Sequence, residues 1–219
     1  MSAILSRLAG PIAMAVTAGL LIWRLDENGW GSLLWLGAAV ATAVIRAPFA
    51  AETAENTIDR QEQVGTERIL LIGITLGSMV LPLIHLLTGV FSFANYDLPD
   101  WATAASLLLL VPGFWLFYRS HADLGRNWSV TTELREDHTL VDKGVYRRMR
   151  HPMYTALWLV FGAFPLLIHN WIAGFGAIVA FGALCVLRIP YEERMMIERF
   201  GSVYTDYQGR TGRLVPRFR

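Results

Sequence analysis

The chain has 219 residues, of which 54% are hydrophobic and 17% charged, and its formal net charge is only +1. Soluble domains usually carry about 25% charged residues, so this composition argues against an ordinary soluble protein and favours a membrane protein. The near-neutral charge gives no basic surface of the kind that binds nucleic acid, and no nucleic-acid partner is expected.

Six stretches of the chain are apolar and contain no Asp, Glu, Lys or Arg. In chain order they are residues 8–23, 30–45, 69–96, 102–118, 154–168 and 171–187. Lipid offers no hydrogen-bonding partner to the backbone, so each stretch must be helical or part of a closed barrel, and the absence of period-two alternation excludes the barrel. The sequence therefore predicts an all-α fold: a polytopic membrane protein with about six transmembrane helices.

The basic residues give an independent indication of topology. When the six spans alternate across the membrane, 18 of the 19 lysine and arginine residues fall on one side. Positive residues accumulate on cytoplasmic loops, so both termini are predicted to be cytoplasmic. The two long polar regions of the second half, 119–153 and 188–219, then share that face. Only His169 and Asn170 separate the last two spans, which predicts a tight helical hairpin that holds the two regions together.

The connection at residues 46–68 mixes acidic and basic side chains. Its carboxylates, among them Glu67, are interleaved with arginines, and neither Gly nor Pro occurs between Ala50 and Val64. This pattern favours a solvated surface helix that joins two spans, rather than a functional site.

The polar segment before residue 154 contains the densest group of candidate functional residues. Asp142 to Gly144 is a turn sequence, and Pro152 suits the first turn of the helix that begins there. The arginines between them have a structural alternative, since juxtamembrane arginines commonly contact anionic lipid headgroups. That alternative does not account for His151 and Tyr154, which flank the proline.

A second cluster lies at the end of the last span. Arg188 and Glu192 are four residues apart and share one face if the helix continues past Pro190. They form either a structural ion pair or a site that binds an anionic group beside the membrane. In the tail, Phe200-Gly201 is a helix stop, and the aromatic residues after it are either surface filler or a lid.

Together these elements resemble the isoprenylcysteine carboxyl methyltransferases and their bacterial relatives. The resemblance covers residues 119–219 and is carried, in order, by Leu124-Gly125, Trp128, His138 to Val141, Gly144, Tyr146, Arg150 to Pro152, Tyr154, Arg188, Glu192-Glu193, Phe200-Gly201, Tyr204 and Tyr207. Ala156 and Val145 depart from the pattern, because relatives often have glycine and proline there.

The resemblance implies an integral membrane methyltransferase that moves a methyl group from S-adenosyl-L-methionine to a lipophilic or prenylated acceptor, such as an isoprenylcysteine-like carboxylate. It implies a cytoplasmic cofactor pocket formed by the C-terminal half, and a multi-pass location among the lipids of a bacterial inner membrane. Arg188 is the implied substrate-binding residue and, with Glu192, the implied catalytic pair. The implied cofactor-binding residues are His138, Thr139, Leu140, Val141, Tyr146, His151, Pro152, Met153, Tyr154 and Glu192.

Residues 1–118 show no match to that family. The expected organisation is therefore an N-terminal region of four spans (1–118), where the acceptor is recognised, and a methyltransferase core (119–219) with its two-span hairpin and cytoplasmic tail. The acceptor itself stays open between a prenylated cysteine carboxylate, a lipid amine, a small thiol and another isoprenoid. Glu192 or Glu193 would act as a base for a thiol or an amine, whereas a carboxylate acceptor needs only positioning by Arg188.

Two other classes of protein remain as alternatives. A membrane NADPH-dependent sterol-type reductase also carries an Arg-His-Pro-like element near a span, although the acidic pair and the tyrosine-containing tail fit it less well. A transporter would use polar or broken spans, for which Pro82, His85 and Pro112 are the only hints. The five histidines are dispersed without the spacing of a zinc pair, so no metal is expected.

Overall fold

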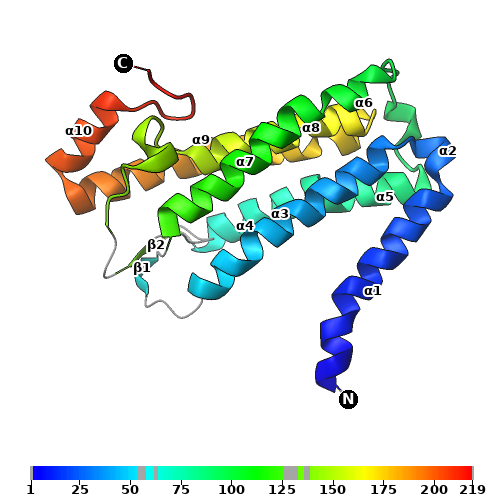
Figure 1. The fold of residues 1–219 in the computed structure, drawn as a ribbon, viewed down its shortest axis with the longest axis horizontal. Coiled ribbons are helices and arrows are strands. Elements are labelled where there is room, and N and C mark those ends of the chain that lie inside the picture. The colour runs from blue at the N-terminus through cyan, green and yellow to red at the C-terminus, as the bar shows by residue number, and fades with distance from the viewer. Residues whose placement is uncertain (1, 54–57, 62–63, 126–132, 136–138, 219) are drawn as a thin grey trace.

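The computed structural model describes residues 2–53, 58–61, 64–125, 133–135 and 139–218, which form an elongated helical bundle (Figure 1). The helices and strands, in chain order, are α1 (Ser2–Trp23), α2 (Leu25–Asn28), α3 (Gly31–Thr53), β1 (Ile58–Gln61), α4 (Val64–Thr75), the π-helix η1 (Leu76–Val80), α5 (Leu81–Thr88), the short 3-10 helix η2 (Ser92–Ala94), α6 (Trp101–Ala105), α7 (Leu107–Leu124), β2 (Glu133–Arg135), the 3-10 helix η4 (Gly144–Arg147), α8 (Pro152–Leu167), α9 (Trp171–Phe200) and α10 (Ser202–Arg210).

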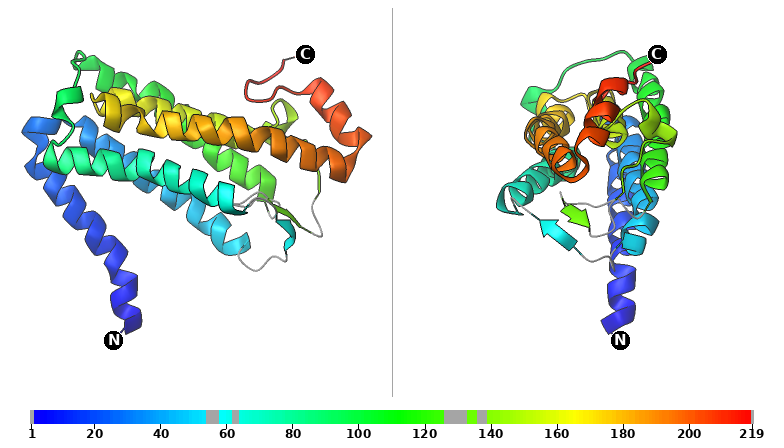
Figure 2. Two further views of the ribbon diagram at one scale, coloured as in Figure 1. Left: turned by 180° about the vertical axis from the view of Figure 1, so that it is seen from behind. Right: turned by 90° about the vertical axis from the view of Figure 1, so that its left-hand side faces the viewer.

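The long helices α3, α4, α5, α7, α8 and α9 run side by side along the bundle (Figures 1 and 2). The most extensive packing joins α7 to α8, and α9 packs against both α8 and α4. Helix α1 diverges from the others and touches them mainly through α2 and α3. Helix α9 therefore links the C-terminal hairpin to the N-terminal half of the chain.

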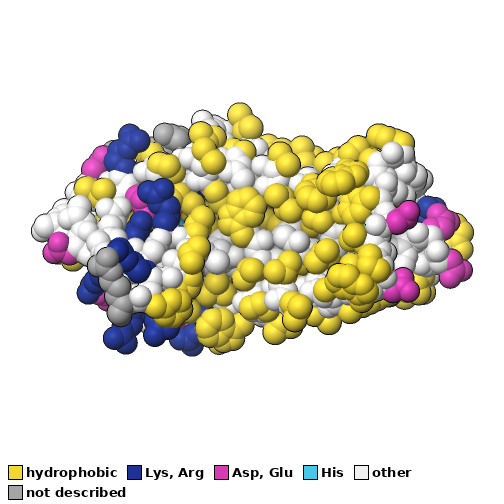
Figure 3. Space-filling model, turned by 90° about the horizontal axis from the view of Figure 1, so that it is seen from above, with side chains coloured by type: hydrophobic (Ala, Val, Ile, Leu, Met, Phe, Trp, Pro, Cys, Tyr) yellow, Lys and Arg dark blue, Asp and Glu magenta, His cyan; other side chains and the backbone are white. Residues whose placement is uncertain are grey.

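Within the described residues, four helical stretches are long and apolar enough to cross a membrane: Gly31–Ala50, Gly65–Thr88, Trp101–Leu124 and Trp171–Phe200. The apolar helices Ile12–Trp23 and Pro152–Leu167 correspond to the other two predicted spans but are shorter. On the face shown in Figure 3, hydrophobic side chains cover the middle of the bundle, and Lys and Arg gather at one end. The prediction of a helical integral membrane protein is confirmed, while the number six stays a prediction.

The third predicted span, residues 69–96, is not one continuous helix. Helix α4 passes through the π-helical turn η1 into α5, which ends at Thr88. Beyond it, the Tyr96 amide donates a hydrogen bond to the His169 carbonyl at 3.0 Å, and Asn95 pairs with Asn170. Because these bonds satisfy the backbone against the α8–α9 turn, the apolar residues after 88 cover the end of the hairpin instead of extending the helix.

The predicted solvated helix at 50–64 is wrong for part of that segment. Helix α3 ends at Thr53, and residues 58–61 form strand β1, which pairs antiparallel with β2. The partner strand lies in another polar region, so the pairing depends on the tertiary fold and not on local propensity. These two strands add a small sheet to the otherwise helical part of the chain that the structure describes.

The α8–α9 hairpin is confirmed, and Asn170 is the residue that fixes it. Its side-chain oxygen accepts hydrogen bonds from the Ile172 and Ala173 amides at 3.0 and 2.9 Å, which caps the first turn of α9. Its side-chain nitrogen donates to the Phe91 carbonyl at 2.7 Å. The fully buried Asn170 therefore ties the hairpin to the segment that follows α5.

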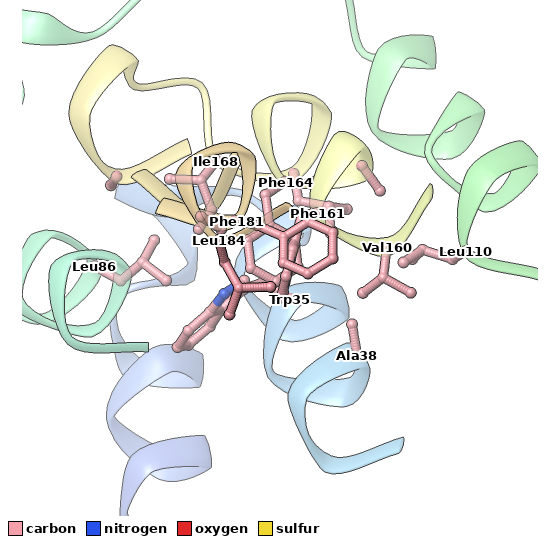
Figure 4. Packing of buried hydrophobic residues seen from close by; sticks show 14 of the residues in the cluster. Trp35, Ala38, Leu86, Leu110, Val160, Phe161, Phe164, Ile168, Phe181 and Leu184 are labelled. Atoms are coloured by element: carbon pink, nitrogen blue, oxygen red, sulfur yellow. The ribbon is translucent and has the colours of Figure 1, made fainter. Parts of the chain in front are cut away.

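The hydrophobic core lies between α3, α5, α8 and α9 and includes Trp35, Leu86, Phe161 and Phe181 (Figure 4). Helices η1 and α9 are in close backbone contact at Gly77, where an added Cβ would lie 2.4 Å from the Gly176 carbonyl oxygen. Such backbone contact leaves no room for a side chain. The core and this crossing fix α4 against α9, and thereby place the polar ends of these two helices side by side.

Candidate functional site

The loop before α8 is fixed from α7. Gly144 has φ +60°, and a Cβ there would lie 2.1 Å from the Asp123 Oδ2 atom. Asp123 accepts a hydrogen bond from the Val145 amide at 2.9 Å and one from Arg119 at 2.6 Å. The adjacent Tyr146 is buried. The turn predicted at Gly144 is thus present, and it needs glycine for both conformation and space.

Helix α8 begins at Pro152, as predicted, and its first turn divides into two environments. Pro152 is buried, and Met153 packs against the buried cluster that contains Leu116 and Phe117 of α7. Tyr154 instead donates a hydrogen bond from its hydroxyl to Glu192 Oε1 of α9 at 2.6 Å. One side of this turn therefore holds the helix in place, and the other reaches the acidic pair.

Helix α9 continues through Pro190 to Phe200, so Arg188 and Glu192 do share one face. The Arg188 Nε atom donates to Glu192 Oε1 at 2.7 Å, the same oxygen that accepts from Tyr154. The second oxygen, Oε2, lies 3.6 Å from His151 Nδ1. Glu192 is thus held through one oxygen, while its side chain keeps 23% exposure.

The neighbouring Glu193 contacts a different set of side chains. Its carboxylate accepts hydrogen bonds from Arg150 Nε and Arg213 Nη2, both at 2.8 Å, and lies 3.3 Å from His151 Nε2. Only 6% of its side chain is exposed. His151 therefore lies between the two carboxylates, which pair with different arginines: Glu192 with Arg188, and Glu193 with Arg150 and Arg213.

Glu67, at the start of α4, also belongs to this group. The prediction that residues 46–68 are a plain surface connector is therefore wrong for Glu67. Its carboxylate lies 3.2 Å from Arg188 Nη1, and its side chain is only 8% exposed. The sequence offered one signal for it: Glu67 is the last carboxylate before the apolar run, as Glu192 is the first after one. A carboxylate at the end of a membrane span is a functional candidate by its position alone.

We refer to these eight side chains as the ion-pair network. They come from the start of α4, the end of the loop before α8, α8, α9 and the tail: Glu67, Arg150, His151, Tyr154, Arg188, Glu192, Glu193 and Arg213.

The C-terminal tail is hydrogen-bonded to the loop before α8, which contributes Arg150 and His151 to the network. The Gly212 amide donates to the Arg148 carbonyl at 3.0 Å, and the Arg150 amide donates to the Gly212 carbonyl at 2.8 Å. In α10 the buried Tyr207 hydroxyl donates to the Tyr146 carbonyl at 2.7 Å. Burial raises the pKa of Tyr207, so the phenol stays protonated and able to donate. The tail is therefore packed against the candidate site, which excludes the surface-filler alternative.

The structure brings together only part of the predicted site. His151, Tyr154, Arg188 and Glu192 belong to the network. Tyr146 and Met153 lie in the same loop and helix start but contact α7, and Pro152 is buried at the start of α8. Among the described residues, no hydrogen bond or ion pair ties Leu140 or Val141 to the network, and Thr139 is exposed. His138 lies outside the residues that the structure describes.

The network also contains residues outside the predicted catalytic and cofactor-binding set, of which Arg150 and Glu193 were part of the resemblance and Glu193 was a candidate base. Glu67, Arg150, Glu193 and Arg213 all contact a predicted site residue or its partner. Within the ranges that the structure covers, no three His, Cys, Asp or Glu residues are grouped so as to hold a metal ion. The arrangement is a set of paired arginines and carboxylates, suited to binding a ligand that carries both signs of charge.

Comparison with known proteins gives one consistent family. The family model for the isoprenylcysteine carboxyl methyltransferase (ICMT) family matches residues 106–198. Protein-S-isoprenylcysteine O-methyltransferase A of Arabidopsis thaliana is 27% identical over 132 residues, covering 59% of this chain and 67% of that protein. The Dictyostelium discoideum Protein-S-isoprenylcysteine O-methyltransferase is 40% identical over 81 residues, covering 36% of this chain and 33% of that protein.

The fold extends the likeness beyond the matched region. The solved structure of the eukaryotic intramembrane Ras methyltransferase, an isoprenylcysteine carboxyl methyltransferase, has a TM-score of 0.58 to this chain at 19% identity, covering 93% of this chain and 73% of that one. At that identity it shows a common fold, which includes the N-terminal half. Most of the ion-pair network, from Arg150 to Glu193, lies within the matched region 106–198. Over residues 106–198 the chain thus matches the isoprenylcysteine carboxyl methyltransferase family, and it shares the fold of a solved isoprenylcysteine carboxyl methyltransferase.

Proposed function

We propose that the chain transfers a methyl group from S-adenosyl-L-methionine to the carboxylate of a prenylated cysteine. Its match to that family indicates an integral membrane methyltransferase, and the relatives described above are protein-S-isoprenylcysteine O-methyltransferases. The observation that carries the proposal is that Tyr154 and Arg188 meet on one oxygen of Glu192. This contact joins the two polar clusters within the region that the family model matches.

The residues of the network fit a donor that carries an ammonium group and a sulfonium group. When bound, S-adenosyl-L-methionine supplies a methyl group on positively charged sulfur. Glu192 is suited to hold a cation, because among the described residues its Oε2 makes only the longer contact with His151, and its side chain is partly exposed. Tyr154 and His151 orient that carboxylate. We assign the cofactor pocket to this cytoplasmic end, with the remaining contacts supplied by His138, Thr139, Leu140, Val141, Tyr146, Pro152 and Met153.

Arg188 is the residue we assign to the acceptor. A carboxylate acceptor is already ionised near neutral pH, so the reaction needs no base. One carboxylate oxygen forms the new bond to the methyl carbon, the C–S bond breaks with its electron pair going to sulfur, and no proton moves. Arg188 and Glu192 contribute by positioning, which supplies up to ~7–11 kcal/mol in reactions of this kind.

The proposed topology has six spans, with both termini and the site in the cytoplasm of a bacterial inner membrane. The two shorter helices, α1 and α8, complete the six. Helix α8 has 16 residues, or about 24 Å at 1.5 Å per residue, and runs beside the longer α9. Residues 1–118 then form the acceptor-recognition region, and residues 119–219 form the methyltransferase core.

Binding of the purified protein in detergent to two cofactors separates the proposed enzyme from the reductase alternative. Calorimetric titration should show binding of S-adenosyl-L-methionine and no binding of NADPH. Transfer of a labelled methyl group to an N-acetyl S-prenyl cysteine should then be detectable, and the same prenyl compound with a carboxamide should accept none. NADPH binding in the absence of S-adenosyl-L-methionine binding would overturn the proposal.

A further inference from the structure

Arg188 is held by two carboxylates that come from different halves of the chain. Glu192 is one helical turn away on α9, whereas Glu67 reaches Arg188 from α4. The side chains of Glu67 and Arg188 are only 8% and 13% exposed, so their attraction is weakly screened by water. The N-terminal half, which the family model does not match, therefore reaches the residue assigned to the acceptor.

The two carboxylates contact Arg188 at different distances. Glu192 lies 2.7 Å from Arg188 Nε, and its accepting oxygen is also held by Tyr154 at 2.6 Å. Glu67 lies at the longer distance of 3.2 Å from Arg188 Nη1, across a contact between two helices. Of the two carboxylates, Glu67 is the one that an incoming carboxylate can replace while Arg188 stays fixed on α9.

Arg46 provides a second guanidinium group in the neighbourhood of Arg188. It lies at the cytoplasmic end of the α3 span, close enough to Arg188 for the two positive charges to repel. Two guanidinium groups whose charges repel in partly buried surroundings favour an anion nearby. The start of α4 provides that anion as Glu67, and a carboxylate on a ligand has the same charge and the same planar shape.

We propose that Glu67 competes with the carboxylate of the acceptor for Arg188, so that Glu67 sets how tightly the site takes a negatively charged acceptor. This inference rests on the proposed function in one respect, the assignment of Arg188 to the acceptor. It adds a specificity-determining residue from the region outside the family match. Glu67 does not need to touch the reacting methyl group to have this effect.

The test compares two ligands with the same prenyl tail: an N-acetyl S-prenyl cysteine and its carboxamide. Glu67→Gln keeps the size of the side chain and removes its charge. We expect this variant to bind the carboxylate at least about fivefold more tightly than the wild type, the size of effect expected for about 1 kcal/mol of competing ion-pair energy. Binding of the carboxamide should stay within about twofold. Glu67→Asp, which keeps the charge on a shorter side chain, should give a smaller gain.

Glu27→Gln is the matched control, because Glu27 is paired with Arg24 at the other end of the bundle. It should change neither binding constant. Weaker or unchanged binding of the carboxylate by Glu67→Gln would overturn the inference, because Glu67 would then be only a support for Arg188. A lower kcat with an unchanged KM for the acceptor would have the same meaning.

The failure of this inference can be told apart from the failure of the proposed function. If the wild type binds the prenyl carboxylate but transfers no methyl group to it, the proposed function fails, and the binding comparison still decides the role of Glu67. If the wild type transfers the methyl group and Glu67→Gln binds both ligands as the wild type does, the proposed function stands and the inference fails.

Discussion

At the scale of single residues, the two adjacent glutamates of α9 have separate tasks. Glu192 is partly exposed and holds Tyr154 and Arg188 through one oxygen. Glu193 is buried and neutralises Arg150 and Arg213. Consecutive residues on a helix point about 100° apart, so one position faces the proposed ligands and the next faces the loop and tail.

Glu192→Gln should abolish most of the turnover without unfolding the protein. The amide keeps the shape of the side chain but weakens its hydrogen bonds with Arg188 and Tyr154. A displacement of about 1 Å at such a site costs on the order of 100-fold in rate. The kcat/KM for the prenyl carboxylate measures the loss. Glu198→Gln makes the same change on an exposed turn of α9 and should retain full activity. Full activity in Glu192→Gln would remove Glu192 from the mechanism.

Glu193→Ala should act on stability. Its removal leaves the Arg150 side chain, which is only 10% exposed, without its carboxylate, and breaking a buried pair in this way costs about 3 kcal/mol. The thermal unfolding midpoint in detergent should fall clearly. Arg213→Ala removes the more exposed partner, with 54% of its side chain in solvent, and should cost less than about 1 kcal/mol. Equal effects of the two substitutions would contradict this distinction.

At the scale of elements, the Tyr207 hydroxyl is one of the groups that attach α10 to the loop before α8, together with the Arg210–Asp142 ion pair. Tyr207→Phe removes the hydrogen bond to the Tyr146 carbonyl and leaves that buried acceptor without its donor, a loss of about 1–3 kcal/mol. Hydrogen exchange should become faster in both segments. Tyr204→Phe is the control: Tyr204 is buried beside Tyr207, but its hydroxyl donates no hydrogen bond to a described residue. Faster exchange in both variants alike would mean that the Tyr207 hydrogen bond has no special part in holding α10.

The elements also show what the sequence could and could not predict. Apolar runs predicted the helices, and the two-residue gap predicted the hairpin, because both depend on local composition and on lipid as the solvent. Arg188 and Glu192 could be paired from their spacing along one helix. The Glu67–Arg188 pair could not, since it requires the packing of α4 against α9. Strand β1 was missed for the same reason, because its partner lies in another polar region.

At the scale of the whole molecule, the crossing of α8 decides the topology. Three apolar helical stretches lie between residue 100 and residue 202 in the part of the chain that the structure describes: Trp101–Leu124, which contains α6 and α7, then α8 and α9. If all three cross, the two positions lie on opposite sides of the membrane, and if the short α8 fails to cross, they lie on the same side. The 16 residues of α8 fall short of the ~20 that usually span a bilayer, so this crossing needs a direct test.

Single cysteines at these two positions test the crossing directly. Cys185 is the chain's one cysteine and is buried, so Cys185→Ala gives a cysteine-free background. Asp100 and Ser202 are both exposed, and each is changed to cysteine in that background. In intact bacterial spheroplasts, a membrane-impermeant maleimide should label Asp100→Cys and leave Ser202→Cys unlabelled until the membrane is opened, because the proposed topology places the basic end of the bundle in the cytoplasm. Labelling of both variants in intact cells would mean that α8 does not cross, and the reverse pattern would mean that the orientation is inverted.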